Sequence, residues 1–258
     1  MNIIIKTKEE IEILREGGKR LATILAKVAQ AVKPGVSAYE LDVLAESLIR
    51  EGGDEPAFKG YKPSHHSKPF PATLCVSVNG EVVHGIPHKD KILKEGDIVS
   101  IDLGIKHKGL FTDHAITVPV GKISKADQEL LTITHEALLA GIHTIGIGTK
   151  VGDVGATIAA YAKKAKYGIV RELAGHGVGK SIHEDPFIPN YGSPGKGVTF
   201  IPGMVVAIEP MFTRGGEGIM VLNDGYTVKT TDNSKSAHFE HTVLITETGA
   251  EILTLPRD

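Results

Sequence analysis

Apolar residues recur at helical spacing in four stretches of the chain, and these stretches come in two pairs. In the first pair, Thr7 is followed three residues later by Glu10, and Ser37 by Glu40. Each step is typical of a capping box, in which a hydroxyl and a carboxylate bind free backbone amides at a helix N-terminus. The pattern predicts a long helix after Thr7 and a shorter one after Ser37, separated by the helix-breaking Pro34.

The second half of the chain repeats this plan. Ser124 and Asp127 open another long stretch with helical periodicity, which ends at the glycines Gly146 and Gly148. A shorter amphipathic stretch follows from Thr149 onward. Both halves are therefore predicted to begin with a long helix, a turn and a short helix.

Strand-like segments follow each helix pair, and these also correspond. An acid stands six residues after a glycine in both halves, Asp102 after Gly96 and Glu209 after Gly203. Two further matches are His84-Gly85 with His176-Gly177, and Asp113-His114 with Glu240-His241. Two such modules can face one another across a pseudo-twofold axis, so that their acids meet in a central site. We expect one domain, residues 1–258, with halves of approximately 1–120 and 121–258.

The matched acids favour a metal site. Asp102 and Glu209 each lie in an apolar run typical of a buried strand, where a carboxylate is costly unless it is paired or binds a metal. A single such acid more often lies on the exposed face of its strand, but four matched acids and two His-Gly steps favour a shared site. Carboxylates and imidazole suit Mn, Fe, Co or Zn. Four carboxylates around one dication would repel each other, so we expect two metals, about 3.5–4 Å apart, that activate water for hydrolysis.

Composition excludes several other classes. The net charge of -2 leaves no basic field for nucleic acid, and no apolar run approaches the ~20 residues of a membrane span. Cys75 is the only cysteine, so no internal disulfide can form. The glycine-rich run 175–179 lacks the spacing of known phosphate-binding loops. We expect a cytoplasmic protein without a nucleic-acid substrate or a membrane partner.

Several long and correctly spaced stretches together resemble the type I methionine aminopeptidases, which have the duplicated pita-bread fold. The matching stretches are 70–79, 81–87, 96–102, 175–184, 204–211 and 239–242. The resemblance implies an α+β fold with two pseudo-twofold-related halves around a central antiparallel sheet. It also implies a metallo-aminopeptidase that removes the initiator methionine from nascent proteins and prefers a small second residue.

The resemblance further implies a ligand set for two divalent metal ions. Asp113 and Glu240 would bridge both ions. Asp102 would hold one ion, and His176 with Glu209 would hold the other. The two ions would activate water and polarise the scissile carbonyl.

The same resemblance implies substrate-binding and catalytic residues. His84 would contact the substrate near the scissile amide, and His183 would stabilise its carbonyl oxygen. Glu209 would move the proton, which makes it the third catalytic residue. Cys75 and Tyr226 would line the substrate pocket, although many relatives carry tryptophan at the position of Tyr226.

Four further histidines, two of them in the segment 62–69, lie outside the assigned site. Alternation along a strand sends His114 and His241 to the face opposite the bridging acids, so we expect both to be structural. The segment 62–69 is longer and more polar than its counterpart in the family, so the sequence does not predict all the residues that shape the methionine pocket. Its adjacent His65 and His66 could bind an extra metal, but a solvated turn is favoured.

The same resemblance implies the partners of the protein. Nascent polypeptide N-termini are the expected substrate, the protein is expected to be a monomer, and contacts with the ribosome near its exit tunnel are left open. One alternative is a prolidase or aminopeptidase P, although these usually carry an additional N-terminal domain. Another is a metal-free pita-bread binding module, which the complete ligand set disfavours.

Overall fold

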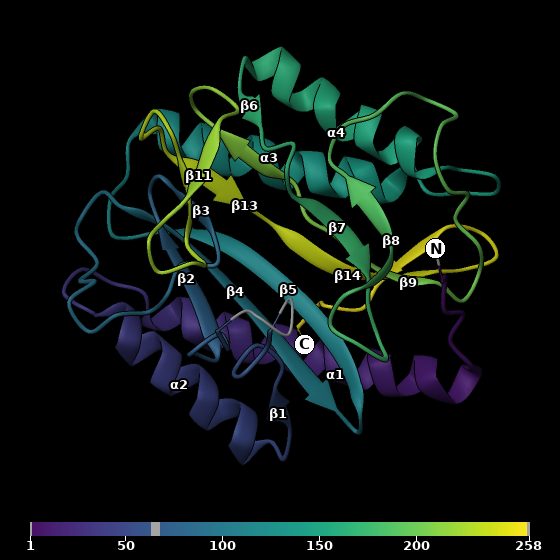
Figure 1. Ribbon diagram of the computed structural model, residues 1–258, viewed down its shortest axis with the longest axis horizontal. Coiled ribbons are helices and arrows are strands. Elements are labelled where there is room, and N and C mark those ends of the chain that lie inside the picture. The colour runs from purple at the N-terminus through teal and green to yellow at the C-terminus, as the bar shows by residue number, and fades with distance from the viewer. Residues whose placement is uncertain (1, 63–67, 257–258) are drawn as a thin grey trace.

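The computed structural model describes residues 2–62 and 68–256, which form four helices and fifteen strands (Figure 1). The interpretation of His65 and His66 therefore lies outside the described residues. The helices are α1 (Lys8–Ala31), α2 (Ala38–Glu51), α3 (Lys125–His143) and α4 (Val151–Ala165). The strands are β1 (Glu55–Pro56), β2 (Leu74–Val78), β3 (Glu81–Val83), β4 (Ile98–His107), β5 (Leu110–Pro119), β6 (Gly168–Ile169), β7 (Ala174–Gly177), β8 (Glu184–Pro189), β9 (Val205–Ile208), β10 (Met211–Thr213), β11 (Ile219–Val221), β12 (Val228–Thr230), β13 (Ser236–His238), β14 (Glu240–Ile245) and β15 (Ala250–Ile252).

The helix starts follow the predicted caps. Capping boxes at Thr7 and Ser37 begin α1 and α2, which confirms both predictions. At the start of α3, Ser124 Oγ accepts a hydrogen bond from the amide of Asp127 at 3.1 Å. The start of α4 differs slightly, because the Thr149 hydroxyl accepts from the amide of Gly146 in the preceding turn and the helix begins at Val151.

One large antiparallel sheet joins the two halves. Its strands lie in the order β1-β4-β5-β14-β9-β7-β8, with β2 also paired to β4 and β15 to β14. The first half contributes the long hairpin β4-β5, and the second half contributes β14, β9, β7 and β8. The halves meet where β5 pairs with β14, with Ala115 opposite Glu240. The α+β architecture around a central antiparallel sheet is as predicted.

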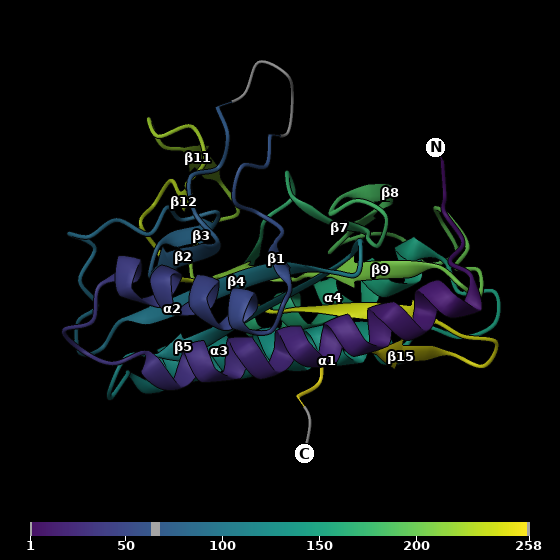
Figure 2. The ribbon, with the colours of Figure 1, turned by 90° about the horizontal axis from the view of Figure 1, so that it is seen from below.

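The helices bury an apolar layer against this sheet. Figure 2 shows α1 running beneath the sheet, while β3, β11 and β12 lie on the other side. Two clusters of buried, mainly aliphatic side chains form the layer, each large side chain contributing about 1.5–3 kcal/mol by leaving water. Their members include Leu21, Leu25, Leu41, Ile101 and Leu103 in the first half, and Leu138, Ile158, Val206 and Val243 in the second.

Candidate metal centre and substrate cavity

Strand register places three of the predicted ligands on one face of the sheet. Ala115 of β5 lies opposite Asp102 of β4 on one side and opposite Glu240 of β14 on the other. Asp113 is two residues before Ala115, so its side chain points to the same face. The side chain of Thr112, next to Asp113, points to the opposite face of the sheet and packs towards Gly17 of α1. The three acids therefore face away from α1.

A second row across the sheet brings in the remaining two ligands. Ala207 of β9 lies opposite His176 of β7 and opposite Thr242, which is two residues after Glu240. Glu209 is two residues after Ala207, just beyond the end of β9. Since each step of two keeps the face, His176 and Glu209 join the three acids.

Close backbone packing explains why a glycine follows the histidine in both His-Gly steps. A Cβ at Gly177 would lie 2.3 Å from the carbonyl oxygen of Asp185 on β8, and one at Gly85 would lie 2.3 Å from that of Val76 on β2. No other residue fits such contacts without moving a strand. The glycines therefore let neighbouring backbone hold the preceding histidines, His84 and His176.

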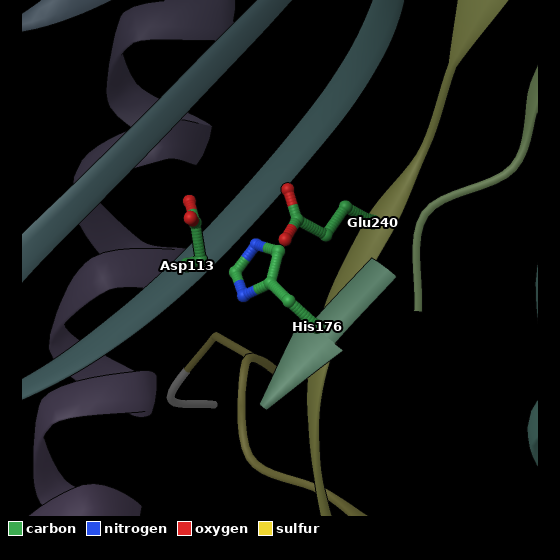
Figure 3. A group of neighbouring side chains, drawn as sticks. All are labelled: Asp113, His176 and Glu240. Carbon is green, nitrogen blue, oxygen red and sulfur yellow. The ribbon is translucent and has the colours of Figure 1, made fainter. Parts of the chain in front are cut away.

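Asp113, His176 and Glu240 form the centre of the site (Figure 3). All three are buried, and one ligand atom from each lies within 4.8 Å of the others. Glu209 adjoins this group, with its Oε1 3.5 Å from His176 Nε2. The His176 Nδ1 lies 2.9 Å from the carbonyl oxygen of Gly177, which can only accept. His176 therefore donates from Nδ1 and leaves Nε2 with a lone pair for a metal.

The electrostatics of these carboxylates fit a cation. Burial raises the pKa of Asp102 to about 7, against the opposing effect of His238. Burial, followed by repulsion from the neighbouring acids, also raises the pKa values of Asp113 and Glu240 well above the usual range. Asp102 Oδ1 and Glu240 Oε1 are buried without a hydrogen-bond partner among the described residues. Orphaned acidic oxygens of this kind are what divalent metal ions would satisfy.

His238 is a member of this cluster that sequence reasoning missed. Its Nε2 lies 3.5 Å from Glu209 Oε2, without the geometry of a hydrogen bond, and its ring is almost completely buried. Burial opposes ionisation of Glu209, but His238 and His176 outweigh it and lower the pKa of Glu209. His238 stands two residues before Glu240 in the sequence, and strand alternation was the signal that could have found it.

A cavity of about 340 Å³ opens over the acids. It is lined by all nine residues assigned from the sequence to metal binding, catalysis or substrate binding, and no lysine or arginine of the described chain lines it. Those nine are Cys75, His84, Asp102, Asp113, His176, His183, Glu209, Tyr226 and Glu240. The lining residues without a sequence assignment are mostly apolar and, apart from Phe70, lie outside the matching stretches: Phe58, Tyr61, Phe70, Leu173, Val221, Gly225 and Val228.

His183 and His84 stand on the cavity wall. His183 Nδ1 lies 2.7 Å from the Tyr61 hydroxyl, and the rings of His183 and His176 have centroids 4.4 Å apart. The His183 ring is exposed at the mouth, yet the surrounding atoms withhold enough water to lower its pKa, and His176 adds to this effect. His84 has a positive φ of 57°, a conformation that costs energy in a non-glycine residue and often marks a functional site.

The apolar end of the cavity is built around Tyr226. Its ring packs edge-on against Phe70 at 5.1 Å between centroids, and its hydroxyl donates to the carbonyl oxygens of Tyr61 and Lys68. Tyr226 therefore joins the two ends of the segment that precedes Phe70. Cys75 is buried in the same wall, and burial raises the pKa of its thiol well above the usual value.

His114 and His241 lie on the other face of the sheet, which confirms the prediction from strand alternation. Their rings stack at 4.7 Å with 14° between planes. His114 Nδ1 donates to the carbonyl oxygen of Glu240, and His241 Nδ1 lies 2.9 Å from the Thr254 hydroxyl. Burial lowers the pKa values of both, so neutral rings brace β5 and β14 behind the acids.

Comparisons with known proteins agree with this geometry. The model of metallopeptidase family M24 matches residues 12–247. Methionine aminopeptidase 1 of Bacillus subtilis is 46% identical over 252 residues, covering 98% of this chain and 99% of the relative. The crystal structure of a methionine aminopeptidase from Thermotoga maritima superposes with a TM-score of 0.93 at 45% identity, covering 98% of this chain and 99% of its own.

A more distant structural relative represents the prolidase alternative. The prolidase from Pyrococcus furiosus has a TM-score of 0.78 at 27% identity, with 99% of this chain but only 66% of the prolidase covered. The two enzymes thus share the fold over this chain, and the prolidase has additional structure. Among residues 2–62 and 68–256, no helix combines the length and apolar character needed to cross a membrane.

Proposed function

Because the chain belongs to metallopeptidase family M24, we propose that it is a methionine aminopeptidase, which removes the initiator methionine from newly made proteins. The observation that carries this proposal is one cavity whose polar side holds four carboxylates and His176 and whose other side is apolar. Residues 1–258 would act as one metallopeptidase domain, with halves of approximately 1–120 and 121–258.

The ligand set for two divalent ions, Mn, Fe, Co or Zn, is Asp102, Asp113, His176, Glu209 and Glu240. Bound there, the ions supply Lewis acidity for a carbonyl oxygen and lower the pKa of water. The chain itself orients the ligands. The Gly177 carbonyl fixes the His176 tautomer, and the hydroxyl of Thr242 joins the backbone of Asp113 through both its amide and its carbonyl, at 2.9 and 2.7 Å.

The apolar side of the cavity receives the methionine side chain. Phe58, Phe70 and Tyr226 enclose it, and Cys75 of the same cavity pairs with Asp102 in the sheet. A volume of about 340 Å³ suits an unbranched thioether together with the adjoining backbone, and its carboxylates disfavour an acidic side chain. The α-amino group of the substrate is a cation, which the same carboxylates attract.

Three residues are proposed to act on the scissile bond. His183 would donate to the carbonyl oxygen, since the Tyr61 hydroxyl engages its Nδ1 and leaves Nε2 for the substrate. His84 would contact the amide nitrogen from the opposite wall. Glu209 would accept the proton from water and pass it to the leaving amine. Its backbone is held by a 2.9 Å hydrogen bond from the Asn190 amide group to its carbonyl.

Two tripeptides separate this function from the prolidase and aminopeptidase P alternative. The metal-loaded protein should release methionine from Met-Ala-Ser and leave Ala-Pro-Ala intact, as measured by chromatography of the products. Release of alanine from Ala-Pro-Ala alone would contradict the proposal. The physiological substrate would be nascent N-termini in the cytoplasm, processed by a monomer.

A further inference from the structure

The N-terminal segment contacts the loop that carries His183. We call residues 2–6 the N-terminal strap; the loop, residues 178–183, joins β7 to β8. The strap amide of Asn2 donates to Asp185 Oδ2 at 2.6 Å, just beyond the loop. The strap and the loop are therefore adjacent although more than 170 residues separate the bonded pair in sequence.

An ion pair buried within this contact joins the strap to the loop backbone. Lys6 Nζ lies 2.5 Å from Glu184 Oε2, and the two side chains are only 1% and 3% exposed. Lys6 Nζ also donates to the carbonyl oxygen of Ile4 at 3.2 Å. The other oxygen, Glu184 Oε1, accepts from the amides of Lys180 and Ser181 at 2.5 and 3.0 Å. One carboxylate thus holds two loop amides and one strap ammonium.

The loop leaves little room for another arrangement. Gly179 has a φ of +144°, and a Cβ there would lie 2.4 Å from Lys6 Cε. The amide of Phe111 donates to the Gly179 carbonyl at 2.7 Å, which fixes the loop against β5 from the other side. A charge buried this deeply is costly without its partner, so loss of Lys6 would force Glu184 to move or to take up a proton.

His183 immediately precedes Glu184 in the chain. Glu184 opens β8 and pairs with Gly177, directly after His176. The His183 ring is exposed, and its direct polar partner is the Tyr61 hydroxyl. The ring also contacts the rings of Tyr61 and His176, and the neighbouring ion pair of Glu184 constrains the backbone from which the imidazole projects.

We propose that Lys6 and Glu184 are positioning residues for His183, whose ion pair fixes the loop so that the imidazole meets the substrate carbonyl oxygen. Neither residue lines the 340 Å³ cavity over the acids. The inference rests on the role proposed above for His183, and it gives the N-terminal strap a part in holding that residue in place. Misplacing a catalytic group by about 1 Å can cost on the order of 100-fold in rate.

The primary test compares Lys6→Met with Lys180→Met in the metal-loaded protein. Lys180 lies on the same loop, but its ion pair with Glu10 is exposed at the surface, so it controls for loss of a loop charge. Lys6→Met should lower kcat for Met-Ala-Ser by about 10- to 100-fold, with KM and metal content near those of the parent. Lys180→Met should change none of these. A Lys6→Met protein with parental kcat would overturn the proposal.

Coupling to His183 separates positioning from general destabilisation. In a His183→Ala background, Lys6→Met should have little further effect on kcat, because the group that it positions is gone. An equal loss in both backgrounds would overturn the proposal. So would parental kcat in His183→Ala itself, while methionine release by the parent would still support the proposed function. If Lys6→Met does not fold, Glu184→Gln replaces it, since the amide oxygen can still accept from the loop.

A spectroscopic readout does not depend on activity. The imidazole NMR signals of His183 in zinc-loaded protein, identified by their loss in His183→Ala, should shift or broaden in Lys6→Met and stay unchanged in Lys180→Met. Unchanged His183 signals in Lys6→Met would overturn the positioning role even if the protein released no methionine. The two proposals can therefore fail separately.

Discussion

His84 and His176 occupy matched positions of the two halves, yet the fold places them differently. His176 lies in β7 within the central sheet, opposite Ala207, with a ring nitrogen within 4.8 Å of carboxylate oxygens of Asp113 and Glu240. His84 follows β3, which pairs with β12 in a separate small sheet, and its backbone has a positive φ. Membership of the central sheet, and not the local His-Gly step, decides which histidine joins the acids.

The four acids, unlike the two histidines, all lie on or next to strands of the central sheet, although those strands differ in length. Asp102 and Asp113 lie on one continuous hairpin of two ten-residue strands. Glu209 and Glu240 belong to shorter strands, of four and six residues, with Glu209 just past the strand end. All four still reach one cavity, because the strands that carry them are neighbours in one sheet. The halves are thus equivalent in their acids and unequal in their histidines.

Metal removal tests the equivalence of the acids with the largest expected effect. Because both halves are proposed to supply ligands, exhaustive chelation should abolish methionine release, and added Mn, Co or Fe should restore it. Peptide hydrolysis and elemental analysis of the same samples give the measurement. Full activity in protein shown to be metal-free would exclude the proposed mechanism.

Single substitutions then test whether the histidines are unequal. Asp113→Asn and Glu240→Gln, one from each half, should both reduce metal occupancy. His84→Ala should keep a parental metal content while lowering turnover by roughly 10²- to 10⁴-fold, the range for losing a proton-transferring group. Elemental analysis beside kcat distinguishes the two classes. Metal loss in His84→Ala as complete as in Glu240→Gln would make the two histidines equivalent after all.

The proposed methionine pocket also draws on both halves of the chain, because Phe70 comes from the first half and Tyr226 from the second. A narrow apolar slot discriminates single methylene groups by about 1–3 kcal/mol, or 10- to 200-fold. Met-Ala-Ser should therefore exceed Leu-Ala-Ser in kcat/KM by at least about 10-fold, and Met-Ala should exceed Met-Leu peptides. Comparable kcat/KM values for Met-Ala-Ser and Leu-Ala-Ser would leave a broader aminopeptidase and remove the methionine assignment.

The smallest effect concerns the helix caps of the two halves. The Asp127 side chain at α3 is 5% exposed and contacts Arg214 and Lys235 at 2.9 and 3.1 Å, whereas that of Glu10 at α1 is 22% exposed and forms an ion pair only with Lys180 among the described residues. Burial opposes ionisation of Asp127, but hydrogen bonds from Ser124 and these cations outweigh it and lower its pKa. Asp127→Asn should cost about 1–2 kcal/mol at pH 7, more than Glu10→Gln.

The pH dependence of that cost has a definite sign. Because the folded pKa of Asp127 lies below the unfolded value of about 3.9, its stabilisation is complete above that pH and disappears as the pH falls through the folded pKa. The difference in Tm between metal-free parent and Asp127→Asn should stay constant from about pH 7 to pH 5 and shrink below about pH 4. A difference that grows towards low pH would contradict this assignment.

Local signals in the sequence were sufficient for the helices and for the duplication. A capping box acts within four residues, so Thr7 and Ser37 were enough to place the starts of α1 and α2. Strand alternation likewise separated Asp113 from His114 without knowledge of the neighbouring strands. The nine residues were assigned from the matched motifs together with the resemblance to a known family, and the fold brings all nine to one cavity. Their individual roles remain predictions.

Only the tertiary structure decided what surrounds those residues. Phe58, Leu173 and Val228 look like ordinary core positions in sequence and become cavity wall because distant segments converge. His238 of β13 comes within 3.5 Å of Glu209, which follows β9 of the central sheet, and Lys6 meets Glu184 across 178 positions of the chain. Such contacts depend on how strands are ordered and how closely backbones pack. Patterns within a few residues record which face a side chain takes, but not which distant side chain it will meet there.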